Sequence, residues 1–113
     1  MQLIRGTTPR ITAKIKNDID LHTLVEVWVY ISQRNKVRVD KTIDDVIFDY
    51  ENNYIIVSLT QEDTLALKKG IALIQIRALT ANEQALSMEA QDIEVIEVYK
   101  GGVIEEEENE DNG

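Results

Sequence analysis

The chain has 113 residues, 43% of them hydrophobic, and a formal net charge of −9. It contains no cysteine, which excludes disulfides, thiolate nucleophiles and Cys-type zinc sites, and its single histidine leaves little room for histidine-based catalytic or metal sites. No run approaches the ~20 consecutive apolar residues of a membrane-spanning helix, and residues 1–5 lack the apolar stretch of a secretory signal, so we expect no contact with a membrane.

Alternation of apolar and polar residues dominates the sequence and predicts an all-β protein. The first strand is expected at residues 10–16, with Lys14 and Lys16 on its solvent face. The clearest is expected at residues 24–32, because β-branched or aliphatic side chains fill every inward position: Val25, Val27, Val29 and Ile31. Six further strands are expected at residues 36–41, 46–50, 54–59, 71–79, 86–90 and 93–99.

One segment departs from this pattern and predicts a short helix at residues 61–69. Thr60 and Asp63 have the spacing of a capping box, and Lys68 and Lys69 suit the last turn of a helix. Gly70 follows at the position where helices often end. About seven or eight strands with one short helix predict an antiparallel β-sandwich.

Charge divides the chain into a basic first part and an acidic remainder. Residues 1–41 carry eight basic and four acidic side chains, whereas residues 42–113 carry four basic and seventeen acidic ones. Six of these acids lie in residues 105–113, which contain no basic residue. Such a segment cannot bury enough apolar surface to offset its ordering entropy, so we expect one domain at residues 1–104 and a disordered acidic tail at residues 105–113.

The residues that carry chemistry do not form a catalytic pattern. The neighbouring pairs Asp44-Asp45 and Glu62-Asp63 do not show the separation across a cleft that glycosidases need, and the second pair is explained by a helix N-terminus. His22 has no cysteine or second histidine with which to share a metal. No glycine-rich phosphate loop is present. We therefore predict a protein that is not an enzyme and that uses no cofactor or metal.

The sequence supports a binding surface better than it supports a catalytic site. Trp28 and Tyr30 share one face of the clearest strand and could stack against a sugar, although coverage of both faces of the strand, or packing under a loop or partner, is the more common reason for such a pair. Basic residues on and beside the strands could contact phosphates, but a net charge of −9 opposes binding to nucleic acid, and lysine and arginine also protect strand edges from aggregation. The predicted interaction surface comprises Lys14, Lys16, Trp28, Tyr30, Lys36 and Arg38.

The charge division also suggests how such a surface would be used. We expect the basic strand surface of residues 1–41 to meet an acidic surface on a neighbouring copy or on another component of an assembly. Two alternatives remain at this point: a small carbohydrate-binding module that uses Trp28 and Tyr30, and a regulatory protein whose acidic tail mimics nucleic acid.

Several short segments stand in a familiar order: Arg5-Gly6-Thr7-Thr8-Pro9, Leu59-Thr60-Gln61-Glu62-Asp63-Thr64 with Leu67 and Gly70, Gln75-Ile76-Arg77, and Lys100-Gly101-Gly102-Val103-Ile104. Together they resemble a family of small proteins encoded by phages and prophages of Gram-positive bacteria, which are similar to the immunoglobulin-like N-terminal domain of phage baseplate upper proteins. The resemblance covers residues 3–104. It implies an immunoglobulin-like sandwich that serves as a structural or assembly accessory of a tail, baseplate or neck.

The same resemblance implies partners and a location. The partners would be other phage structural proteins or further copies of the chain; the net charge and the lack of a long apolar run already argue against nucleic acid and membrane. The protein would act in the host bacterial cytoplasm during assembly and would then be associated with the virion. Longer family members join this domain to fibre regions, whereas here an acidic tail follows, so an accessory role fits better than fibre anchoring.

Overall fold

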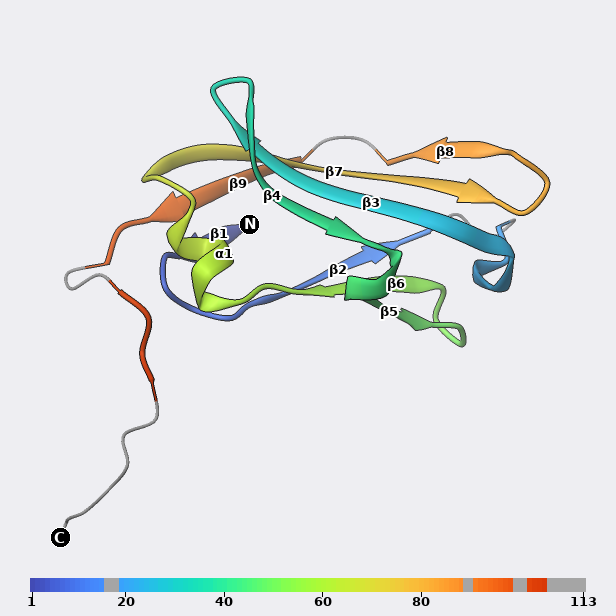
Figure 1. Ribbon diagram of the computed structural model, residues 1–113, viewed down its shortest axis with the longest axis horizontal. Coiled ribbons are helices and arrows are strands. Elements are labelled where there is room, and N and C mark those ends of the chain that lie inside the picture. The colour runs from blue at the N-terminus through green and yellow to red at the C-terminus, as the bar shows by residue number, and fades with distance from the viewer. Residues whose placement is uncertain (16–18, 89–90, 99–101, 106–113) are drawn as a thin grey trace, which may run out of the picture.

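The computed structural model describes residues 1–15, 19–88, 91–98 and 102–105. The chain folds into two β-sheets that face each other (Figure 1). The large sheet has the order β1-β9-β7-β3-β4, with β8 paired to the end of β7 that lies beyond its pairing with β9, and the small sheet has the order β2-β6-β5. The strands of the large sheet are β1 (Gln2–Ile4), β3 (Leu24–Gln33), β4 (Lys36–Thr42), β7 (Gly70–Thr80), β8 (Ala85–Ser87) and β9 (Gln91–Ile96). Those of the small sheet are β2 (Arg10–Lys14), β5 (Val46–Asp49) and β6 (Tyr54–Ser58).

The hydrophobic core lies between the sheets and is built by the predicted alternation. Val27, Val29 and Ile31 of β3 point inward and are at most 1% exposed, and Ile55 and Val57 of β6 meet the core from the small sheet with 0% exposed. Successive side chains of a strand point to opposite faces, so each inward residue leaves an outward neighbour in solvent. The predicted all-β sandwich is confirmed.

Six of the strands follow the order of an immunoglobulin sandwich. In that fold strands A, B, E and D form one sheet and C, F and G the other. The small sheet supplies counterparts of B, E and D in β2, β6 and β5, and the large sheet supplies C, F and G in β3, β7 and β9. Strand β1 differs in two ways, because it lies in the large sheet and not beside β2, and because it pairs with β9 in parallel and not antiparallel.

Four local features differ from the sequence-based expectations. Strand β1 was not expected, because three residues are too few to show a period. Val25 is 51% exposed, because the pairing of β3 with β7 shifts between Leu24 and Glu26 and turns Leu24 inward instead. The helix α1 (Gln61–Leu65) is shorter than the expected residues 61–69. Two 3-10 helices, η1 (Leu21–Thr23) and η2 (Ile43–Asp45), were also not expected.

The early end of α1 has a cause elsewhere in the chain. Gln33, at the end of β3, is only 6% exposed, and its side-chain amide bonds to both backbone groups of Lys68. Its Nε2 donates to the Lys68 carbonyl at 2.7 Å, and its Oε1 accepts from the Lys68 N–H at 2.8 Å. Lys68 therefore bonds across to β3 rather than along a helix.

The segment between β1 and β2 is fastened to α1 through one buried hydroxyl. Thr64 is 0% exposed, accepts a hydrogen bond from the Gly6 N–H and donates one to the Thr7 carbonyl, each at 2.9 Å. Arg5 donates to the Leu65 carbonyl at 3.0 Å and forms an ion pair with Glu97. Gly6 adopts a φ of 82°, a conformation that glycine reaches without strain.

Some sequence-based expectations fall outside these residues. Lys16 and residues 106–113 of the expected acidic tail lie outside the part of the chain that the structure describes, so the expected disorder of the tail stays a prediction. Within the described part, no helix has the length and apolar character needed to cross a membrane.

Candidate interaction surfaces

The predicted interaction residues occupy three different places on the sandwich. Trp28 and Tyr30 lie on the outer face of β3, an interior strand of the large sheet. Lys36 and Arg38 lie on β4, at the edge of the same sheet. Lys14 lies on β2 in the small sheet, so it does not share a surface with the other described members of the set.

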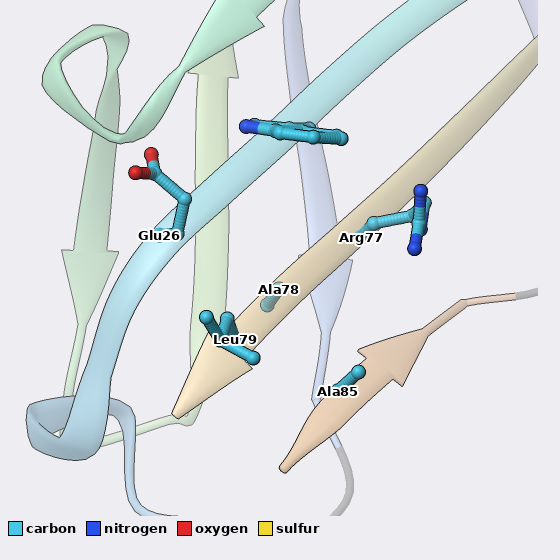
Figure 2. Close-up of a pocket in the computed structure, with 6 residues that line it drawn as sticks. Glu26, Arg77, Ala78, Leu79 and Ala85 are labelled. Atoms are coloured by element: carbon cyan, nitrogen blue, oxygen red, sulfur yellow. The ribbon is translucent and has the colours of Figure 1, made fainter. Parts of the chain in front are cut away.

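Trp28 borders a shallow cavity of about 150 Å³ on the outer face of the large sheet (Figure 2). The other lining residues come from three adjacent strands and are Glu26, Arg77, Ala78, Leu79 and Ala85. Arg77 is the cross-strand neighbour of Trp28, and its guanidinium carbon lies 5.5 Å from the centre of the indole ring. This is a cation–π contact, so part of the aromatic face is already covered.

Tyr30 lies away from that cavity. It pairs with Gln75 on one side and with Asp40 on the other, and it is half-buried. Of the two expected aromatic residues only Trp28, which is 48% exposed, lines this cavity.

Further apolar side chains are exposed on the same outer face. Ile71 and Leu73 of β7 are 60% and 43% exposed, and Val37 of β4 is 54% exposed. Leu73 and Val37 both flank Ser32 of β3 in the sheet register, so these side chains lie near one another. Exposed apolar groups that gather on one face are typical of a surface that contacts another molecule.

A cluster of positive charge lies where the β3–β4 hairpin meets the loop before β7. Arg34, Arg38, Lys68 and Lys69, here called the basic cluster, line a cavity of about 90 Å³. The hairpin turn places Arg34 and Asn35 at φ values of 51° and 63°, as a two-residue turn of the primed type requires. The two hydrogen bonds between Gln33 and Lys68 hold the loop against this hairpin.

The four cations of the basic cluster form no ion pair with a carboxylate among the described residues. The ion pairs of the described residues join Arg5 to Glu97, His22 to Asp20 and Lys41 to Asp63, and none of them includes a member of the basic cluster. The Arg38 Nε is buried without a hydrogen-bond partner. Four cations around one small cavity therefore produce a local positive field on a protein of net charge −9.

One member of the basic cluster, Lys69, has a small electrostatic effect on the pKa of a nearby acid, Glu97. The pKa of Glu97 is held below its usual value, first by the Val98 N–H and then by Arg5, with a smaller contribution from the charge of Lys69. Lys69 thus acts on Glu97 through space without forming an ion pair with it.

Sequence reasoning found Arg38 but missed the lysines of the basic cluster. Lys68 and Lys69 were interpreted as the last turn of a helix, and nothing in the local pattern places them beside residues 34–38. The signal would have been Gln33, a polar residue at an inward position that has to find hydrogen-bond partners when buried.

His22 belongs to an exposed group at the end of the sandwich. Its ring stacks on Tyr50 with centroids 3.9 Å apart, and its Nδ1 lies 3.0 Å from the Asp20 carboxylate. The pKa of Asp20 is lowered, first by the backbone N–H of His22 and then by its ring. No three histidine, aspartate or glutamate side chains gather at a point suited to a metal within residues 1–15, 19–88, 91–98 and 102–105.

Comparison with known proteins does not assign the chain to a family. No protein-family model matches the sequence, and a search of curated proteins finds no relative. The resemblance to phage proteins therefore stays a prediction based on the short segments quoted above.

Proposed function

We propose that this protein is a non-catalytic assembly module that binds other proteins through surfaces of complementary charge. The observation that carries the proposal is the basic cluster, whose four cations have no carboxylate partner among the described residues. The remainder of the chain is strongly acidic, and residues 105–113 alone carry six acids. A second copy therefore offers the chemistry that the basic cluster would attract.

Complementary charge would speed association and fix its orientation more than it would increase the affinity. Opposite potentials steer two surfaces together and fix their orientation, whereas a single exposed ion pair contributes only about 0.2–1 kcal/mol. The exposed apolar side chains of the outer face, Val37, Ile71 and Leu73, lie beside the basic cluster along β4 and β7 and could supply buried area.

The resemblance described above supplies the biological setting of this proposal. The assembly would be a phage or prophage particle, with the protein acting as an accessory of its tail, baseplate or neck. Its partners would be further copies or other phage structural proteins, met first in the host bacterial cytoplasm and then in the virion.

Analytical ultracentrifugation across a salt series tests the proposal. We expect copies of the chain to associate at low salt and to separate as salt rises, because salt screens exposed charges. Changing Lys68→Glu and Lys69→Glu together should weaken this association by about tenfold or more, which corresponds to 1.4 kcal/mol.

The matched control reverses the same number of charges elsewhere. Arg10→Glu with Lys14→Glu changes two exposed cations of the small sheet and should alter the association by less than about twofold. Association that does not respond to salt, or that both double variants weaken equally, would contradict the proposed role of the basic cluster. So would a chain that stays monomeric at low salt.

A second candidate function is favoured by one observation, the half-exposed indole of Trp28 beside a cavity that also holds Glu26 and Arg77 (Figure 2). A carbohydrate ring could stack on the indole while the charged groups bind its hydroxyls. It ranks second because the guanidinium of Arg77 already lies over the ring.

A glycan array distinguishes the two functions. If the second candidate is correct, the chain binds glycans, and Trp28→Ala abolishes this binding. Tyr50→Ala is the matched control, because Tyr50 is similarly exposed at 51% but lies on the small-sheet side after β5. The assembly proposal predicts no glycan signal for either the wild-type chain or the variants.

A further inference from the structure

Strand β2 has one edge along which no strand pairs among the described residues, and the backbone groups on that edge can be assigned. Among the described residues it pairs with β6 alone, with Ile11 opposite Val57 and Ala13 opposite Ile55. The Ile15 N–H donates to the Asn53 carbonyl, so the odd-numbered residues of β2 face β6. The N–H and C=O groups of the even-numbered residues therefore point to the open side: Arg10, Thr12 and Lys14.

A groove runs along this open edge, between the two sheets. Two adjoining cavities of about 390 and 200 Å³ share Lys14, Ile76, Met88 and Gln91 among their lining residues. The groove is mainly apolar, because Ile76 is an inward residue of β7 and Met88 is half-buried against the core, as is Leu86 of β8.

The topology explains why this groove exists. In the immunoglobulin sandwich the strand beside B is strand A. The counterpart of B is β2, and the first strand of this chain, β1, pairs with β9 of the large sheet instead. The position beside β2 is consequently one that an added strand would fill.

We propose that this edge is a site for β-strand addition, in which an extended segment of a partner protein pairs with β2. Its backbone would bond to Arg10, Thr12 and Lys14, and every second side chain would enter the apolar groove. The exposed side chains of Arg10 and Lys14 would stand beside its outward side chains, so acidic residues are favoured there. The partner segment is therefore one in which apolar and acidic residues alternate.

Hydrogen exchange of the free protein gives the first test. The amide protons of Ala13 and Ile15 should exchange slowly, because they face β6, and those of Arg10, Thr12 and Lys14 should exchange quickly. Equal protection of both sets would mean that the edge is already covered and would overturn the proposal.

A synthetic peptide with the sequence EIEVEIEV, in which acidic and apolar residues alternate throughout, provides a probe of the required chemistry. At a peptide concentration ten times its Kd, it should slow exchange at Arg10, Thr12 and Lys14 by about tenfold. Thr12→Pro, which removes one edge N–H without touching the ladder to β6, should weaken binding by about tenfold or more, whereas Thr12→Val should change it by less than about twofold.

Two double variants test peptide binding at the β2 edge without depending on Thr12→Pro. If Thr12→Pro fails to fold cooperatively, Arg10→Glu with Lys14→Glu should instead reject this peptide and favour one with lysine in place of its acids. Lys68→Glu with Lys69→Glu should leave peptide binding unchanged, which separates this site from the basic cluster. A probe that does not bind at millimolar concentration, or that binds without protecting the edge amides, would overturn the proposal.

Discussion

Replacing Thr64 by valine is expected to lower the free energy of unfolding by about 2 kcal/mol. Valine fills the same volume, but it can neither accept the Gly6 N–H nor donate to the Thr7 carbonyl, and Thr64 is fully buried. A buried polar group that loses its partner costs about 1–3 kcal/mol, and exposure of Thr7 lets water replace part of the loss. Urea denaturation followed by far-UV circular dichroism measures the change.

The control is the same substitution where the hydroxyl faces solvent. Thr12→Val lies at an exposed position of β2 and should change stability by no more than about 0.5 kcal/mol. If Thr64→Val is equally harmless, the hydroxyl does not hold the segment before β2 against α1, and packing of Leu65 and Leu67 would have to do so.

The sandwich could be predicted from the sequence because its strands are long and one-sided. In β3 and β7 a buried residue is followed by an outward one over most of the strand, and this is the signal that a period of two gives. The capping box at Thr60 likewise indicated where α1 begins, and the structure shows both of its hydrogen bonds.

What the sequence could not show depends on contacts between distant residues. The outward turn of Val25 follows from a shift in the pairing of β3 with β7, and the end of α1 follows from Gln33, 35 residues before Lys68. The basic cluster depends on the same contact, because local pattern alone assigns Lys68 and Lys69 to a helix end. The open edge of β2 could be assigned only once β1 was found beside β9.

Gln33 therefore links the fold to the proposed function, and Gln33→Leu is expected to affect both. Leucine is of similar size but leaves the Lys68 N–H and carbonyl without their partner, so we expect a loss of about 2–3 kcal/mol in the free energy of unfolding. The loop that carries Lys68 and Lys69 would also lose its attachment to the hairpin that carries Arg34 and Arg38. Salt-dependent association should fall although every charge is retained.

Measuring both stability and association shows whether the basic cluster depends on the hydrogen bonds of Gln33. Gln84→Leu makes the same substitution in the exposed turn between β7 and β8, away from the basic cluster and from Val37, Ile71 and Leu73, and should leave both stability and association nearly unchanged. Chemical denaturation and ultracentrifugation of the two variants can be compared under conditions in which both remain folded. If Gln33→Leu lowers stability but associates as the wild-type chain does, the basic cluster does not need its fixed geometry, and charge alone would account for the contact.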